Sequence, residues 1–377
     1  MPSQKIKVLI VDDSALIRKL LSEILSSDIA LEVVGTAMDP EIAKRKIKEL
    51  SPDVITLDVE MPKMDGVSFL KLIMRNKPTP VLMISSLTEK GAEVTMDALE
   101  AGAIDFVSKP SSDISGTLQN FSEEIITKVK LAAKVKVYPG ITTTRPVVKP
   151  KPKPQPVRTH LDPDEKFSAT AIIKRSPMQN NIINTTDKVI AIGASTGGTE
   201  AIKEILMTLS VDIPPVVIVQ HIPPVFSRAF AKRMDALCPL KVAEVNDRQI
   251  LMPGHVYIAP GDRHLLVKRD GAKYCCLLND GPRVNRHIPS VDVLFRSMAQ
   301  YVGPNGMGII LTGMGADGAR GLLEMKEAGA FTIAQDEKTS VVWGMPGEAV
   351  KRNAVEKIAS LYDIAGLIEN RFRSSKI

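Results

Sequence analysis

Short hydrophobic runs alternate with amphipathic stretches along the first third of the chain. The runs are rich in Val, Ile and Leu and predict buried strands, while the stretches between them have the apolar spacing of helices. The expected strands cover 7–11, 31–37, 53–58, 80–85 and 104–108, and the expected helices cover 15–25, 40–50, 66–75, 91–102 and 117–133. This alternation predicts an α/β domain with a doubly wound parallel sheet.

A second strand-helix pattern begins near residue 188. Strand-like runs at 188–194, 215–221 and 241–245 are separated by helical patterns. The stretch 255–278 then contains three strand-like runs divided by Pro-Gly-Asp and Asp-Gly, which are hairpin signals, before strand-helix alternation resumes. The pattern therefore predicts a second doubly wound parallel sheet, Rossmann-like, with an inserted antiparallel hairpin.

The segment between the two patterns has the composition of a linker. Residues 139–158 alternate Lys and Pro and contain five basic residues and no acid. Such a segment favours an extended polyproline conformation and cannot build a core. We expect a first domain at 1–130, a linker at 131–187 and a second domain at 188–377, which suits a chain of 377 residues.

Composition narrows the class of protein. The net charge is +6, and the linker accounts for most of it, so the folded parts are close to neutral and a nucleic-acid partner is not expected. No apolar run is long enough to cross a bilayer, and the N-terminus lacks a signal-peptide pattern. The three cysteines form no metal-binding or disulfide pattern. We expect a cytoplasmic protein that does not insert into the membrane.

Charged and hydroxyl side chains stand at the carboxyl ends of the first domain's strands. Asp12, Asp13 and Asp58 end two strands, Ser85 ends another and Lys109 follows the last. Because these ends converge on one edge of a doubly wound sheet, the three carboxylates should meet, and a hard cation such as Mg²⁺ would relieve their repulsion. A carboxylate beside Mg²⁺, a lysine and a hydroxyl is placed to accept a phosphoryl group.

A glycine-rich loop, "GASTGG", follows the first strand of the second domain and carries Ser195. A dinucleotide site would need G-x-G-x-x-G and an acid at the end of the next strand, but the spacing differs and that strand ends in His221. A P-loop would need a lysine after the glycines, which is absent. A serine nucleophile is the better interpretation, and it requires a base and a carboxylate.

His221 is the candidate base, because it ends the next strand and can lie across the switch crevice from Ser195. His255, His264 and His287 remain alternatives on this reasoning. Asp317, in a second glycine loop, is the candidate carboxylate, although such a residue can also simply cap a helix. Backbone N–H groups of 312–315 would suit an oxyanion. The order Ser, His, Asp differs from that of α/β-hydrolases and predicts a different fold.

The first domain resembles a response-regulator receiver domain, which is flavodoxin-like. The motifs "VDDS", "ITLDVEMPKMDG", "MISS" and "AIDFVSKP" stand in that family's order. The resemblance implies that Asp58 is the phosphoacceptor. It implies roles for further residues as follows: Mg²⁺ binding by Asp12, Asp13, Asp58 and the backbone carbonyl of Glu60, phosphoryl sensing by Ser85 and Lys109, and an aromatic switch at Phe106.

The second domain resembles the protein-glutamate methylesterase domain of chemotaxis response regulators. The resemblance rests on "IGASTGG", "QHIP", "HVYIAPGDRHL", "HIPSVDVLFRS", "LTGMGADGARGL" and "AQDEKTSVVWGMP". It implies Ser195 as nucleophile, His221 as base and Asp317 as its orienter, with Thr196 and Met314 lining the site and Met314 near an oxyanion donor. No cofactor is expected in this domain.

The same resemblance implies an activity and its partners. The substrates would be methylated glutamates of chemotaxis receptors, with methanol released, and receptor glutamines would be deamidated. A chemotaxis histidine kinase would donate the phosphoryl group, and the unphosphorylated receiver would cover the catalytic edge. A receiver with a DNA-binding output is the competing class, but the second domain shows neither a helix-turn-helix pattern nor a basic folded face.

Overall fold

The computed structural model describes residues 5–62, 64–110, 115–135, 137, 167–175 and 187–373. The chain divides into two compact units, Met1–Pro146 and Val147–Ile377, and each is described by itself. The Lys-Pro segment that we expect to be extended lies outside the described residues.

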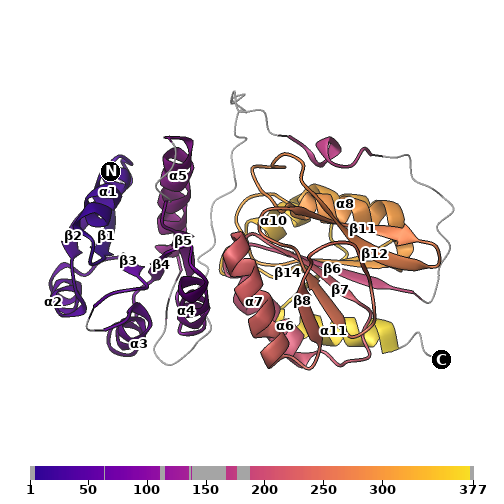
Figure 1. Cartoon of the computed structure of the whole chain (residues 1–377), viewed down its shortest axis with the longest axis horizontal. Helices are drawn as coiled ribbons and strands as arrows, with labels where there is room; N and C mark the ends of the chain where they lie inside the picture. Colours follow the sequence, from indigo (N-terminus) through magenta and orange to yellow (C-terminus); the bar gives the residue numbers. More distant parts are fainter. Residues whose placement is uncertain are drawn as a thin grey trace. The chain divides into compact units, whose positions relative to one another are not determined.

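The first unit is a five-stranded parallel sheet covered by helices (Figure 1). The strand order β2-β1-β3-β4-β5 is that of a flavodoxin-like doubly wound fold, as the sequence predicted. The strands are β1 (Ile6–Val11), β2 (Leu31–Ala37), β3 (Val54–Asp58), β4 (Val81–Ser85) and β5 (Asp105–Ser108). The helices are α1 (Ala15–Ser26), α2 (Pro40–Leu50), α3 (Gly66–Asn76), α4 (Glu89–Glu100) and α5 (Ser115–Ala132).

Local sequence fixes where several of these helices begin. Ser14, Asp39, Asp65 and Thr88 each accept a hydrogen bond from a backbone N–H of the first turn of α1, α2, α3 and α4, respectively. Such a side chain satisfies a donor that the helix itself leaves unpaired. A polar residue in the loop after each of β1, β2, β3 and β4 therefore starts the next helix.

The second unit contains a seven-stranded parallel sheet of order β15-β14-β13-β6-β7-β10-β8. The hairpin predicted at Asp-Gly is present, and its strands β11 and β12 form a separate antiparallel sheet in which β12 also pairs with β9. The Pro-Gly-Asp signal does not mark a hairpin, because the run before it, His255–Ile258, pairs in the parallel sheet. The strands of the parallel sheet are β6 (Val189–Ala194), β7 (Val216–Gln220), β8 (Lys241–Glu244), β10 (His255–Ile258), β13 (Gly306–Ile310), β14 (Phe331–Gln335) and β15 (Lys357–Ala359). The antiparallel strands are β9 (Gln249–Ile250), β11 (His264–Asp270) and β12 (Lys273–Asn279).

Six α-helices belong to the described part of this unit and cover its sheets (Figure 1). They are α6 (Gly198–Thr208), α7 (Pro224–Leu237), α8 (Val291–Tyr301), α9 (Ala319–Glu327), α10 (Met345–Lys351) and α11 (Leu361–Arg373), and two short 3-10 helices are η1 (Ala169–Ala171) and η2 (Gly303–Asn305). The chain adds β7, β10 and β8 on one side of β6 and β13, β14 and β15 on the other, so the switch point lies between β6 and β13.

Part of the expected linker packs on the second unit. In segment 167–175, Ala169 and Ile173 are buried in a cluster with residues of β11 and α8. Arg296 of α8 donates to the Thr170 hydroxyl at 2.9 Å. This stretch is mostly polar and has few apolar residues, so its packing is not evident from the sequence. The residues that pack on the second unit therefore begin before residue 188.

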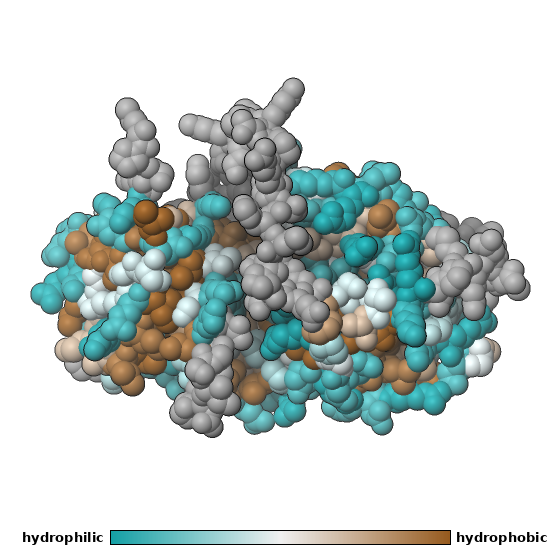
Figure 2. Space-filling model, turned by 90° about the horizontal axis from the view of Figure 1, so that it is seen from above, coloured by the Kyte–Doolittle hydropathy of each residue, from teal (hydrophilic) through white to brown (hydrophobic). Residues whose placement is uncertain are grey.

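Hydrophobic residues fill the space between sheets and helices in both units, and the outer surface is mixed. Figure 2 shows hydrophilic residues interleaved with smaller hydrophobic areas on the visible face. Within the described residues, none of the helices has the length and apolar content to cross a bilayer.

Candidate active site and phosphoacceptor site

The Ser195 loop lies at the carboxyl end of β6, close to the switch point. Ser195 N donates to Thr312 O at 3.0 Å, and Gln220 Nε2 donates to Ser195 O at 2.8 Å, so the loop is tied to both neighbouring strands. Gly197 has φ of 75° and is the N-cap residue just before α6, where a Cβ would meet Val341 at 2.6 Å. The glycine allows the left-handed conformation and close packing that this sharp turn needs.

His221 stands beside Ser195 because β6 and β7 are neighbours. Ala194 pairs with Gln220, and His221 N donates to Ala194 O at 3.1 Å. His221 therefore lies on the same side of the switch point as Ser195, and our expectation that it lies across the crevice is wrong. The physical reason is the chain's crossover to an adjacent strand after α6, which delays the reversal until β13.

Asp317 completes the group from across the switch point, in the loop between β13 and α9. Its Oδ2 lies 2.9 Å from His221 Nε2. An acceptor at this distance requires the proton on Nε2, so His221 Nδ1 keeps its lone pair. Nδ1 is buried and has no hydrogen-bond partner among the described residues. It is therefore the ring atom left to accept a proton.

Asp317 is held as an anion despite complete burial. Burial alone would raise its pKa, but the hydrogen bond and charge of His221, the charge of His287 and the Asn285 amide outweigh it and lower the pKa below the usual value. Further donors converge on the carboxylate, namely Ser290 Oγ at 2.8 Å and Val291 N at 2.7 Å. Asp317 therefore fixes the imidazole by both charge and position.

The 312–315 loop packs directly against the serine. A Cβ on Gly313 would approach Ser195 Cβ to 2.8 Å and Met345 Sδ to 2.3 Å, so only glycine lets the two backbones come this close. Gly313 N is used by Val342 O at 3.0 Å, whereas the half-buried Met314 has no backbone acceptor within the described ranges. The N–H of Met314 is thus available beside the Ser195 loop. Thr196 is buried in that loop, and its carbonyl accepts from Thr312 Oγ1 at 3.0 Å.

The other histidines separate clearly from the candidate base. His255 begins β10 at the opposite edge of the sheet. His264 is buried, with its two ring nitrogens joined to Pro282 O and Ser290 N, which indicates a structural role. His287 does reach the site, where its ring stacks on His221 with centroids 3.9 Å apart and planes 5° apart.

The loop before α8 supplies residues that the sequence reasoning did not identify. Asn285 Nδ2 donates to Asp317 Oδ1 at 2.8 Å and to Asp292 Oδ2 at 2.7 Å. Burial and the neighbouring charge of Asp317 raise the pKa of Asp292 to about 7. The sequence signal for these residues is the cluster of polar residues in "VNRHIPSVD", in which only the histidine is a candidate by sequence pattern.

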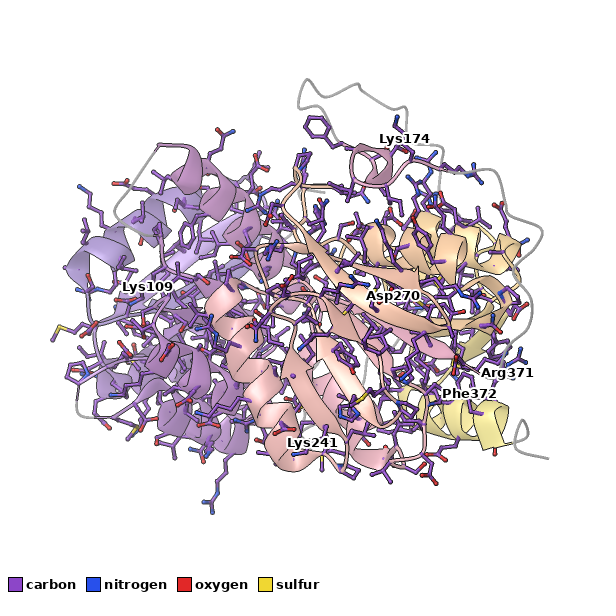
Figure 3. The ribbon with its side chains drawn as sticks, turned by 45° about the vertical axis from the view of Figure 1, so that its right-hand side comes forward. Lys109, Lys174, Lys241, Asp270, Arg371 and Phe372 are labelled. Atoms are coloured by element: carbon purple, nitrogen blue, oxygen red, sulfur yellow. The ribbon has the colours of Figure 1, made fainter. Side chains whose placement is uncertain are left out.

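The acidic pocket of the first unit forms as expected. Asp12, Asp13 and Asp58 bring carboxylate oxygens within 4.8 Å of one another. Lys109 Nζ lies 2.9 Å from Asp58 Oδ2 and 3.1 Å from Asp12 Oδ2, and Figure 3 labels this lysine. Burial, and then the charge of Asp12, raise the pKa of Asp58 to about 6.

This pocket fits a hard divalent cation. Asp12 Oδ2 is buried and makes no hydrogen bond of good geometry, even though Lys109 is near. Its other oxygen accepts from Ser14 N at 2.8 Å, which holds the carboxylate in place. Glu60 lies two residues after Asp58, and its N–H lies 3.4 Å from Asp58 Oδ1. An all-oxygen, acidic donor set of this kind is the one that Mg²⁺ prefers.

Ser85 and Phe106 join the pocket to the neighbouring elements. Thr95 of α4 donates to Ser85 Oγ at 2.8 Å, and Lys109 N donates to Ser85 O at 2.7 Å. Phe106 is buried, and Lys128 of α5 donates to its carbonyl at 2.7 Å. Ser85 is thereby joined to α4 and Lys109, and Phe106 is joined to α5.

Known proteins resemble this chain along both units. Residues 190–368 match the CheB methylesterase family model, and residues 8–117 match the response regulator receiver domain. The chain is 54% identical to the protein-glutamate methylesterase/protein-glutamine glutaminase of Hydrogenovibrio crunogenus over 367 residues, covering 96% of this chain and 97% of the relative. It is 52% identical to protein-glutamate methylesterase/protein-glutamine glutaminase 1 of Geobacter metallireducens, covering 96% and 94%.

A crystal structure of the Thermotoga maritima CheB methylesterase catalytic domain is 34% identical, covers 50% of this chain and 100% of that domain, and has a TM-score of 0.49. The near full-length relatives decide the assignment, because they align with both units and with the segment between them. The chain belongs to the protein-glutamate methylesterase/protein-glutamine glutaminase family, with a receiver domain ahead of the catalytic domain.

Proposed function

We propose that this chain is a phosphorylation-activated serine hydrolase. Its substrates are methylated glutamates in the cytoplasmic part of chemotaxis receptors, from which it releases methanol, and receptor glutamines, from which it releases ammonia. One observation carries the proposal: His221 lies beside the Ser195 loop, with Nε2 bound to Asp317 and Nδ1 open.

The first chemical step is acyl transfer to Ser195. His221 Nδ1 takes the hydroxyl proton as the serine oxygen attacks the γ-carbonyl of the methylated side chain. The same nitrogen then gives the proton to departing methanol, which leaves an acyl-serine. Asp317 stabilises the imidazolium that exists between these events.

Backbone donors stabilise the charge that develops on the substrate oxygen. Met314 N–H stands beside the Ser195 loop with no acceptor in the described part of the chain, and Thr196 lines the same place. A preorganised donor of this kind typically contributes about 10²–10³-fold in rate. In the second step His221 removes a proton from water, and the resulting hydroxide attacks the acyl carbon. The bond from that carbon to Ser195 Oγ breaks, His221 returns the proton to the serine oxygen, and the glutamate side chain leaves as the free acid.

The receiver supplies the control. Asp58 accepts the phosphoryl group from a chemotaxis histidine kinase, while Asp12, Asp13 and the Glu60 carbonyl would hold Mg²⁺ with it. The cation would offset the charge of the acyl phosphate that forms. Lys109 contacts Asp58, and Ser85 is joined to α4. We expect both residues to respond to the charge of the phosphoryl group. Phosphorylation then favours the active arrangement of the enzyme.

Methanol release from methylated receptor membranes tests this function. Wild type should release methanol faster after a small-molecule phosphodonor and Mg²⁺ are added, and Ser195→Ala should release none above background. Thr208→Ala is a matched control, because this exposed hydroxyl of α6 donates to Glu204 O away from the site. Unchanged release by Ser195→Ala would overturn the proposal.

A further inference from the structure

The loop that carries Asn285 is a tight turn with an unusual backbone. Val284 and His287 exchange two backbone hydrogen bonds, at 2.9 and 2.8 Å. The two central residues, Asn285 and Arg286, have φ of 51° and 72°. This is the pattern of a type I′ turn, in which Asn is favoured at the first central position and a long side chain at the second is strained. The turn ends at His287, whose ring stacks on that of His221.

Residues 167–175, which are part of the expected linker, hold this turn in place. Asn285 N donates to Phe167 O at 3.1 Å. Val284 is fully buried against Ala169 and Ile173 of the same segment. Figure 3 labels Lys174, next in sequence after Ile173, beside the short helix of this segment. We call residues 167–175 the strap.

The strap is itself anchored through a buried ion pair. Arg296 of α8 binds both carboxylate oxygens of Glu324 of α9, at 2.8 and 2.6 Å. Its remaining nitrogen reaches the Thr170 hydroxyl at 2.9 Å and Ile173 O at 3.4 Å. Contacts within the catalytic unit therefore fix the strap at several points.

We propose that Asn285 is a positioning residue for the catalytic triad and that the strap sets where its amide stands. This inference rests on the proposed function. The single NH₂ group of Asn285 donates one hydrogen to Asp317 and the other to Asp292. Without these donors two buried carboxylates would face each other with no shared partner, and one of them would take up a proton or move. Movement of Asp317, or a proton on it, weakens its hydrogen bond to His221 Nε2.

Several titratable groups surround Asn285, and a test of its role must separate its effect from theirs. Asp317 and Asp292 accept from it, His221 and His287 face Asp317, and Glu324 lies near Asp292. Ser290 joins His264 to Asp317, because its N–H donates to His264 Nδ1 and its hydroxyl donates to Asp317 Oδ1. Burial lowers the pKa of His264, and its Nδ1 accepts from Ser290 N, so it acts in the neutral form.

Two substitutions in the full-length chain distinguish positioning from mere folding. Asn285→Gly keeps the left-handed backbone and deletes the amide, and kcat should fall roughly ten- to hundred-fold with little change in KM. Asn285→Asp keeps shape but adds a carboxylate, which can donate only when the cluster gains a proton. Its activity relative to wild type should therefore recover as pH falls, whereas the ratio for Asn285→Gly stays flat.

Substitutions in the strap test its role while Asn285 itself stays unchanged. The double substitution Ile172→Ala and Ile173→Ala should lower kcat several-fold, in the direction of Asn285→Gly, because it loosens the Phe167 carbonyl. Arg175→Ala is the matched control, since its pair with Glu327 is exposed and contributes little. Melting temperature and Asp58 phosphorylation verify that each variant is folded.

The outcomes are distinct. If Asn285→Gly and Asn285→Asp turn over like wild type while Ser195→Ala is dead, the positioning role is wrong and the proposed function stands. Equal losses at all pH values in Asn285→Asp and Asn285→Gly would also contradict it. If Ser195→Ala keeps full activity, the proposed function itself fails.

Discussion

His221 and Asp317 are joined through Nε2 of the imidazole, 2.9 Å from Oδ2 of the carboxylate, and this leaves Nδ1 as the open nitrogen. The choice of nitrogen follows from the fold. His221 extends from the end of β7 beside Ser195, while Asp317 approaches from the loop after β13 across the switch point.

Asp317→Asn should nearly abolish catalysis. The amide can present a donor to Nε2 and favours the wrong tautomer, so we expect kcat to fall by roughly 10³–10⁴-fold. Asp280→Asn, which loses an exposed contact with Arg263, should be close to wild type. Steady-state methanol release measures both, and an Asp317→Asn enzyme within ten-fold of wild type would exclude the assigned role.

Gly313→Ala should damage the site by crowding. The new methyl would overlap Met345 Sδ and Ser195 Cβ, which forces the loop away from the serine. We expect activity to fall at least ten-fold, by analogy with a lost oxyanion donor. Gly366→Ala in α11 meets nothing within 4 Å and should keep its activity and gain up to about 1 kcal/mol of stability. Similar activities for the two variants would argue against close packing at Ser195.

Asp58 makes the receiver less stable as pH rises. Its pKa is raised to about 6, so between about pH 4 and 6 the folded state binds more protons than the unfolded state, and stability falls with rising pH across that window. Asp58→Asn removes this cost and should stabilise the receiver by up to about 2–3 kcal/mol at pH 7, with a smaller gain near pH 4. Calorimetry in a metal chelator checks this, and a destabilised variant at pH 7 would contradict the raised pKa.

Mg²⁺ should relieve this destabilisation of the wild-type receiver. A cation among the carboxylates of Asp12, Asp13 and Asp58 relieves their repulsion, so the melting temperature of the receiver should rise with Mg²⁺ concentration. The gain should largely vanish in Asp12→Asn. Equal shifts in both proteins would place the cation elsewhere.

The Arg296–Glu324 pair should be costly to break singly. Both side chains are buried, so Arg296→Met leaves Glu324 without its partner and should cost about 3–5 kcal/mol. Replacing Glu324 by Leu in the same chain should recover much of the loss. Urea unfolding of the catalytic unit measures this, and additive losses in the double variant would show that the two residues act independently.

Hydrophobic periodicity predicts the strands of the first sheet, the hairpin of β11 and β12, and most strands of the second parallel sheet, because most of these strands are buried. It does not predict the short strands β9 and β15, whose residues are mostly not buried. Chemistry at strand ends was predictable for the same reason: parallel strands bring Asp12, Asp58 and Lys109 to one edge whatever the details of packing. The placement of His221 at this edge also follows from the rule. The side of the switch point on which it lies depends on the order of the strands.

The supporting residues were beyond the sequence because their contacts are long-range. Asn285 and Asp317 are 32 positions apart, and their hydrogen bond depends on a turn whose φ values no periodicity reveals. The strap has only a few apolar anchors in a polar stretch, and their partners lie far along the chain. Which nitrogen of His221 stays open is likewise decided by tertiary packing.

The covalent intermediate offers the most direct test of the central claim. A short peptide containing glutamate methyl ester can be mixed with the enzyme, quenched with acid within milliseconds and analysed by mass spectrometry. We expect an adduct of the peptide minus methanol on the fragment that contains Ser195, with no adduct in Ser195→Ala. Methanol release accompanied by an adduct on another residue, or persisting in Ser195→Ala, would contradict it.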